Sequence, residues 1–253
     1  MLLEVKDLKK TYTTRFGGNK VQALTGVSFT VSEGEFVAIM GESGSGKTTL
    51  LNILASLDRP TGGEVLLSGK PLSGIPDRAL STFRRENLGF VFQDFNLLDN
   101  FSIKDNVFLP LVLSDRPYKE MEARFRPLAA KLGITEIRDK FPYEVSGGQK
   151  QRAAVARALI TGPKLVLADE PTGALDSRSA DSLLDLFGQI SADGQTILMV
   201  THSVRAASVA DRVLFIKDGV VGSELSRAGE RPDRFYQRIT EARAALETGG
   251  DRA

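Results

Sequence analysis

Apolar runs separated by polar turns predict most of the strands in this chain. Positions 2–12 and 23–31 alternate between apolar and polar residues, which is typical of strands with one buried face. Residues 35–40 form a short run that is apolar after its first residue, as expected of a strand buried on both faces. Similar runs at 164–170 and 196–201 predict two more buried strands. The pattern therefore indicates a small β layer that leads into an α/β core.

Shorter segments predict the remaining strands. Residues 64–68 and 87–92 each have the length and composition of a short strand. Residues 212–217 and 220–224 are separated by Asp218-Gly219, a dipeptide that favours the tight turn of a two-residue hairpin. This predicted hairpin closes the core.

Helical spacing replaces the strand pattern between residues 94 and 162. Ser102 and Asp105 have the spacing of a helix N-cap, and the segment 106–113 that follows is almost entirely apolar. One interpretation of this segment is a buried helix bent at Pro110. The other is a hydrophobic groove that receives a helix of a partner protein.

The domain organisation follows from these elements. We expect one domain over residues 1–225, with a helical subdomain inserted at about 94–162. Residues 226–253 are polar and mixed in charge, so we expect a C-terminal tail in which 234–246 form an exposed helix.

Composition narrows the classes of function. The 253 residues include 42% hydrophobic residues, enough for a large core, and the net charge of +1 argues against a general nucleic-acid surface. The absence of cysteine excludes disulfides, thiolate metal sites and cysteine nucleophiles. The charged N-terminus lacks the apolar core of a signal peptide, and no apolar run approaches the roughly 20 residues of a membrane span. We therefore expect membrane association only through a partner.

A glycine-rich segment between a predicted strand and a predicted helix carries the clearest chemistry. It fits the P-loop pattern, in which glycines let backbone N–H groups approach phosphates and a helix begins at the lysine. Lys47 would neutralise β- and γ-phosphate oxygens, and Thr48 would ligate Mg²⁺. The predicted phosphate site consists of Gly41, Glu42, Ser43, Gly44, Ser45, Gly46, Lys47, Thr48 and Thr49.

Polar residues follow several predicted strands at their carboxyl ends, where open α/β sheets bind ligands. Gln93 could ligate Mg²⁺ or orient water, or it could be an ordinary hydrogen-bonded side chain. Asp169 and Glu170 are adjacent, so one carboxylate could hold Mg²⁺ while the other faces the attacking water. His202, the only histidine in the chain, is a further candidate. Asp176 precedes a predicted helix, where it could also be a simple capping residue.

A second segment could hold a phosphate. Ser146 and Gln149 have capping-box spacing at the start of an alanine-rich helix. Gly147 and Gly148 in the first turn weaken a helix by about 1 kcal/mol each relative to alanine. Such glycines make sense if a phosphate must approach the helix N-terminus closely.

Tyr12 stands at the end of the first predicted strand. It could pack within the sheet, or its ring could stack on a nucleotide base.

The order and spacing of these motifs resemble the ABC ATPase family over roughly residues 2–224. The segment Ser146-Gly147-Gly148-Gln149 distinguishes that family from other P-loop proteins, and Val145 stands where the family usually has leucine. The resemblance implies an α/β fold, with a P-loop NTPase core of mainly parallel sheet, an antiparallel β layer and a helical subdomain.

The resemblance also implies a role for each candidate residue. Tyr12 resembles the aromatic residue that stacks on adenine, and Gln93 the residue that senses Mg²⁺ and water. Asp169 resembles the Mg²⁺ carboxylate and Glu170 the general base. The remaining roles are the D-loop aspartate for Asp176, the γ-phosphate contact for His202, and, for Ser146, Gly147, Gly148 and Gln149, a signature that reaches the γ-phosphate of a second subunit.

A finer resemblance concerns the subfamily. Residues 14–24 are similar to ATPases of bacitracin-resistance exporters, and 142–152 to the wider group with macrolide-export, lipoprotein-release and cell-division ATPases. These relationships imply ATP and Mg²⁺ as cofactors, a homodimer, a separate membrane permease, and a location at the cytoplasmic face of the membrane. No role with nucleic acid is implied.

Other classes fit less well. A repair ATPase would carry a long coiled coil between the P-loop and the signature, and a translation ATPase would carry two ATPase units. A small-molecule kinase would not need the Ser146–Gln149 signature. A regulatory ATPase that signals through a membrane partner fits the sequence as well as a transporter does.

Overall fold

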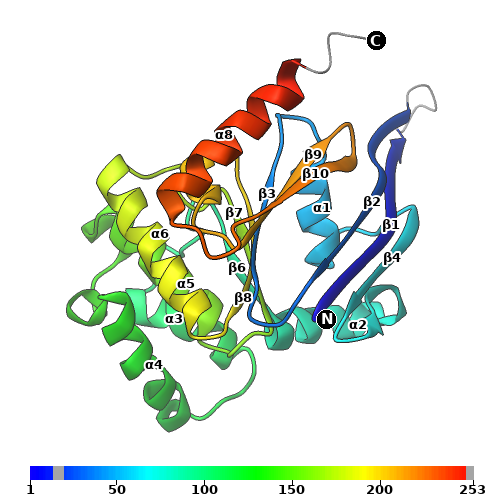
Figure 1. Cartoon of the computed structure of the whole chain (residues 1–253). Helices are drawn as coiled ribbons and strands as arrows, with labels where there is room; N and C mark the ends of the chain where they lie inside the picture. Colours follow the sequence, from blue (N-terminus) through cyan, green and yellow to red (C-terminus); the bar gives the residue numbers. More distant parts are fainter. Residues whose placement is uncertain (14–19, 249–253) are drawn as a thin grey trace. The chain divides into compact units, whose positions relative to one another are not determined.

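The computed structural model describes residues 1–13 and 20–248, and only the backbone of 247 and 248. Figure 1 labels helices and strands along the chain. The chain forms two compact units. The first contains residues 1–74 and the segment from Leu198 onward, and the second contains Ile75–Ile197. The segment 14–19, which carries much of the predicted likeness to bacitracin-resistance ATPases, lies outside the described residues.

An antiparallel sheet begins the first unit, as the sequence predicted. Its strand order is β2 (Lys20–Val31), β1 (Leu3–Thr13), β4 (Gly62–Leu67) and β5 (Lys70–Pro71), followed by a 3₁₀ turn at Leu72–Gly74. β1 pairs with β2 as far as Thr13, whereas its pairing with β4 ends at Lys9 and Gly62. The end of β1 is therefore paired on one side only.

The first unit also contributes strands and helices of the α/β core. β3 (Phe36–Met40) runs parallel to β9 (Arg212–Lys217), which pairs with β10 (Val220–Ser226) in the predicted hairpin. Asp218 and Gly219 have φ values of 50° and 76°, as the turn of such a hairpin requires. The helices of this unit are α1 (Lys47–Leu54), α7 (Val204–Ala207) and α8 (Pro232–Thr248), and β8 (Thr196–Val200) crosses the division between the units.

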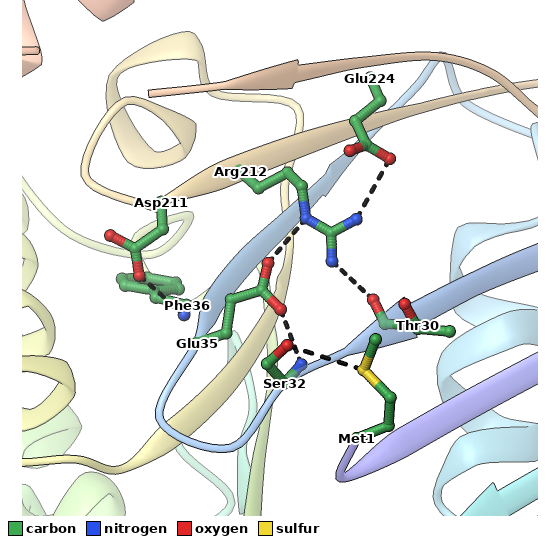
Figure 2. A network of polar contacts seen from close by, with 8 residues as sticks. All are labelled: Met1, Thr30, Ser32, Glu35, Phe36, Asp211, Arg212 and Glu224. Carbon is green, nitrogen blue, oxygen red and sulfur yellow. Dashed lines mark hydrogen bonds and ion pairs between the residues drawn. The ribbon is translucent and has the colours of Figure 1, made fainter. Parts of the chain in front are cut away.

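The side chain of Arg212 links these strands to one another through hydrogen bonds (Figure 2). Its guanidinium donates to the Glu35 carboxylate at 2.7 Å, the Thr30 carbonyl at 2.6 Å and the Glu224 carboxylate at 3.1 Å. Burial alone would lower the pKa of Arg212, but its bonds and charge interactions with Glu35 and Glu224 raise it above the usual value. The network thus holds β9 to the end of β2 and the turn before β3, next to the strands that lead to the P-loop.

The C-terminal helix that the sequence predicted at 234–246 is present as α8 and is mostly exposed, but one of its faces is buried. α8 is longer, and Phe235 and Ile239 are completely buried. These residues are four positions apart and so lie on one helix face. The Lys217 ammonium also donates to the Leu246 carbonyl at 3.0 Å. One face of α8 is therefore packed against the rest of the first unit.

The second unit is mainly helical around two parallel strands, β6 (Leu88–Val91) and β7 (Leu165–Asp169). Its helices are α2 (Asp77–Asn87), α3 (Ile103–Val112), α4 (Tyr118–Leu132), α5 (Gly147–Leu159) and α6 (Ser177–Ala192), with 3₁₀ turns at Thr135–Ile137 and Pro142–Glu144. β6, β7, α3, α5 and α6 correspond to elements predicted individually, and α4 lies within 94–162, where helical spacing was predicted.

The segment 106–113 is largely part of the buried helix α3. Ser102 caps this helix by accepting a hydrogen bond from the Asp105 amide at 3.1 Å, as predicted. Phe108 is 3% exposed, and its ring meets the rings of Phe125 and Tyr118 edge-on. The groove interpretation retains support only at the C-terminal end, where Val112 and Leu113 are more than half exposed.

Candidate nucleotide-binding site

The P-loop of the first unit has the geometry that its sequence predicted. It connects β3 to α1, which begins at Lys47. Gly44 and Gly46 have φ values of 82° and 99°, a region that other residues rarely adopt. A Cβ atom on Gly46 would lie 2.4 Å from the Ala23 carbonyl oxygen, and one on Gly41 would lie 2.3 Å from that of Ile216. Gly46 and Gly41 are therefore required by the close packing of the loop on β2 and β9, whereas Gly44 is favoured only by its positive φ.

The side chain of Lys47 extends back along the P-loop. Its ammonium donates to the carbonyls of Gly41 at 2.8 Å and Glu42 at 2.7 Å. Thr48 is exposed at the second position of α1, and Thr49 is partly exposed beside it. The positive charge and the helix N-terminus are thus presented at the same loop, an arrangement that suits a phosphate group.

A cavity of about 470 Å³ brings the P-loop together with His202. His202 follows β8, where the Thr201 amide donates to the Ile39 carbonyl of β3 at 3.0 Å. The cavity is lined by residues 40–45, His202, residues 215–218, Arg243 and Leu246. The lining does not include the predicted site residues Gly46, Lys47, Thr48, Thr49 and Tyr12 of this unit. Tyr12 lies at the end of β1 and is 41% exposed.

In the second unit, Gln93 and the carboxylates follow neighbouring strands. Gln93 is exposed two residues after β6, and Asp169 and Glu170 are partly buried at the end of β7. A Cβ atom on Gly173 would lie 2.9 Å from Cδ of Gln93, so the loop after Glu170 passes close to the glutamine. Glu170 has a φ of 44°, a strained conformation for a residue with a side chain that is often found at functional sites.

The predicted capping box at Ser146 is confirmed. The Ser146 amide donates to Oε1 of Gln149 at 2.9 Å, and the Gln149 amide donates to Oγ of Ser146 at 3.3 Å. A Cβ atom on Gly148 would lie 3.0 Å from Oγ of Ser179 in α6, so packing within the chain already accounts for this glycine. Gly147 has only ordinary contact distances, the shortest 3.7 Å, to Leu175. The case for a closely approaching phosphate therefore rests on Gly147 more than on Gly148.

Asp176 is the N-cap of α6, as one interpretation of the sequence had it. Its carboxylate accepts hydrogen bonds from the amides of Arg178 at 3.1 Å and Ser179 at 3.0 Å. Hydrogen bonds from the Ser179 side chain and amide lower the pKa of Asp176 below its usual value. Capping α6 is therefore a sufficient structural role for Asp176, and its carboxylate stays ionised in that role.

Comparison with known proteins gives this geometry its context. A family model described as "ABC transporter" matches residues 24–173, more than half of the chain. The chain belongs to the ABC transporter family of ATP-binding proteins. It is 51% identical to the uncharacterized ABC transporter ATP-binding protein YvcR of Bacillus subtilis, over 99% of this chain and 96% of the relative. It is 45% identical to the bacitracin export ATP-binding protein BceA of Halalkalibacterium halodurans, over 97% and 96% respectively.

Solved structures of ABC cassettes share the fold. A dimeric post-hydrolysis state of the ATP-binding cassette MJ0796, bound to ADP and Pi, has a TM-score of 0.80 and 38% sequence identity. The match covers 89% of this chain and 98% of that one. The predicted P-loop NTPase fold and the assignment as an ATPase are thereby confirmed.

Gln151 is a residue of this ABC ATPase that sequence reasoning missed. It is completely buried in α5, and its amide nitrogen donates to the carbonyls of Phe92 at 3.0 Å and Pro171 at 2.7 Å. Phe92 immediately precedes Gln93, and Pro171 immediately follows Glu170. Gln151 therefore ties the signature helix to the loops that carry both predicted catalytic side chains of this unit. In the sequence, the only indication of this role was that Gln151 lies two residues after Gln149.

The donors predicted for Mg²⁺ are of the right chemical type. Mg²⁺ prefers oxygen ligands and is usually held by one or two carboxylates together with substrate phosphates. Thr48, Gln93 and Asp169 offer a hydroxyl, an amide oxygen and a carboxylate. Among residues 1–13 and 20–248, no cluster of at least three histidine, cysteine or acidic side chains could hold a metal by itself. Within the same residues, no helix is both long and apolar enough to cross a membrane.

Proposed function

We propose that this chain is the ATP-hydrolysing subunit of a transporter that drives a separate membrane permease. Two copies would enclose two ATP molecules, each between the P-loop of one copy and the signature of the other. The observation that carries the proposal is that the P-loop and the capped N-terminus of α5 both have the form of a phosphate site. In addition, Gln151 of α5 is bonded to the carbonyls of Phe92 and Pro171, the residues next to Gln93 and Glu170.

Each candidate residue then has a defined task. Lys47 and the loop amides bind the phosphates, and Tyr12 stacks on the base. Thr48 and Gln93 would hold Mg²⁺ directly, and Asp169 through water; the ion, when bound, neutralises charge that develops on the phosphates. Glu170 accepts a proton from the attacking water, and His202 contacts the γ-phosphate. Ser146, Gly147, Gly148 and Gln149 complete the site of the partner copy, together with Asp176.

The relatives support a separate permease. The macrolide export ATP-binding/permease protein MacB of Hyphomonas neptunium is 44% identical to this chain, which covers only 37% of it. In contrast, the chain covers 96% of BceA, whose name describes only an ATP-binding protein. We infer that the permease functions are supplied by another polypeptide, which would hold the complex at the cytoplasmic face of the membrane.

The name of BceA, which refers to the peptide bacitracin, also favours a cargo class, antimicrobial peptides exported for resistance. The alternative is a complex of the lipoprotein-release or cell-division type, which transmits force or a signal. The end of α3 favours neither, since exposed Val112 and Leu113 could contact either kind of membrane partner.

Purification of the tagged chain from detergent-solubilised membranes tests the proposal. We expect an integral membrane protein, identified by mass spectrometry, to remain bound, and bacitracin to stimulate ATP hydrolysis by the complex. Lys47→Ala should keep the membrane protein but abolish hydrolysis. A complex with active hydrolysis that bacitracin leaves unchanged would favour the force-transmitting alternative. Full hydrolysis without any bound membrane protein would contradict the proposal.

A further inference from the structure

A hydrogen-bonded cluster of three side chains surrounds the end of β1. The Tyr12 hydroxyl donates to Oδ2 of Asp58 at 2.8 Å. The Lys10 ammonium donates to Oδ1 of the same carboxylate at 2.6 Å and lies 4.8 Å from the centroid of the Tyr12 ring. Lys10 therefore covers one face of the ring, while the side chain as a whole stays 41% exposed. An exposed ring held on one face is suited to stacking on its other face.

The other two side chains of the cluster, Lys10 and Asp58, are less exposed to solvent than Tyr12. The side chains of Lys10 and Asp58 are only 11% and 28% exposed. Burial would raise the pKa of Asp58, but hydrogen bonds from Lys10, Tyr12 and the Arg59 amide outweigh it and hold the pKa below the usual value. The carboxylate is therefore ionised at neutral pH, and hydrogen bonds to a charged acceptor are stronger than neutral ones.

Asp58 connects this cluster to the helix that begins at the P-loop. α1 starts at Lys47 and ends at Leu54, and the amides of Leu57 and Asp58 donate to the Asn52 carbonyl at 2.8 and 3.2 Å. The turn that carries Asp58 is thus bonded to the last turn of α1. From the other side, the Thr61 amide donates to the Lys9 carbonyl of β1 at 2.8 Å.

A second connection runs through β2. Tyr12 pairs with Val21 and Lys10 with Leu24 in the antiparallel ladder. Gly46 of the P-loop packs directly against Ala23 and Leu24 of the same strand. The ring and the phosphate-binding loop are therefore fixed relative to each other both through α1 and through β2.

We propose that Asp58 and Lys10 are positioning residues that hold the Tyr12 ring at a set place relative to the P-loop, ready to stack on the adenine base. The proposal rests on the stacking role assigned to Tyr12 under the proposed function. It adds that the affinity for the base depends on Asp58, in the turn after α1, and on Lys10, as well as on Tyr12.

Binding of ADP and of inorganic pyrophosphate by the purified chain separates this role from general stability. Both ligands bind through phosphates, but only ADP has a base. We expect Tyr12→Ala to weaken ADP binding about 5- to 150-fold. Tyr12→Phe, Lys10→Met and Asp58→Ala should each weaken it about two- to tenfold. Pyrophosphate binding should stay within about twofold of the parent value in all of them.

The matched control is Lys9→Met, the same substitution one position earlier on β1. Lys9 bonds to Asp7 at 2.8 Å, but both side chains are well exposed, and ADP affinity should not change. In the double variant of Tyr12→Phe and Asp58→Ala, the losses should be smaller than additive, because both remove the same hydrogen bond.

The possible outcomes are distinct. If Tyr12→Ala binds ADP as the parent does, the stacking role fails, and this inference fails with it. If Tyr12→Ala is weak while Lys10→Met and Tyr12→Phe match the parent, only the positioning role is overturned. Equal losses for ADP and pyrophosphate would likewise overturn it, because they would show damage to the P-loop itself.

Discussion

Glu170→Gln is expected to slow ATP hydrolysis about 10²–10⁴-fold while leaving ATP binding intact. This corresponds to about 3–5 kcal/mol of activation free energy. Glutamine has nearly the size and shape of glutamate and is still polar, but its neutral amide cannot accept the proton of the attacking water. Glu170 is partly buried at the end of β7 with a positive φ, so its side chain is aimed by a constrained backbone. Phosphate release and equilibrium ATP binding are the two measurements.

Glu136→Gln is the matched control for this prediction. Glu136 is exposed in a 3₁₀ turn of the same unit, and the same chemical change there should leave turnover unaltered. If Glu170→Gln retained near-normal turnover, another group would have to be the general base.

Mixing two inactive variants is expected to restore one ATP site if each site is shared between two chains. Lys47→Ala removes the ammonium of the P-loop in the first unit. Ser146→Arg removes the N-cap of α5 in the second unit and places a bulky cation there. In a hybrid dimer, the intact P-loop of one chain would face the intact signature of the other, and the second site would contain both defects.

The measurement is nucleotide trapped per dimer, after hybrids of differently tagged variants are isolated. Trapping is a better readout than turnover, because hydrolysis could require both sites to close together. We expect about one nucleotide per two chains in the hybrid and none in either parent variant. Verified hybrids that trap nothing, beside a parent dimer that does, would show that each site lies within one chain.

The P-loop and the signature could be predicted because the residues that form each of them lie close together in the sequence. Glycines at 41, 44 and 46 precede Lys47 at a spacing that backbone geometry demands, and Ser146 and Gln149 satisfy each other within one helical turn. The buried strands could be predicted for a similar reason, since a continuous apolar run has few alternatives.

Features that depend on distant partners could not be predicted. α2 buries no side chain completely and contains only three apolar residues, Ala79, Leu80 and Phe83, so no apolar segment predicted it. Gly148 meets Ser179 of α6, and Tyr12 meets Asp58 across 46 positions of sequence. α8 was predicted as exposed because only a few apolar residues, including Phe235 and Ile239, carry its buried face. Side-chain bonds such as those of Gln151 appear only when the chain has folded.

The molar mass of Glu170→Gln with and without ATP tests the central claim most directly. Slow hydrolysis would allow the closed state, with two chains around two ATP molecules, to persist long enough for light scattering after size-exclusion chromatography. We predict that ATP and Mg²⁺ double the molar mass of this variant, and that adding Lys47→Ala to it prevents the change. A mass that stays at one chain while ATP is bound would contradict the account.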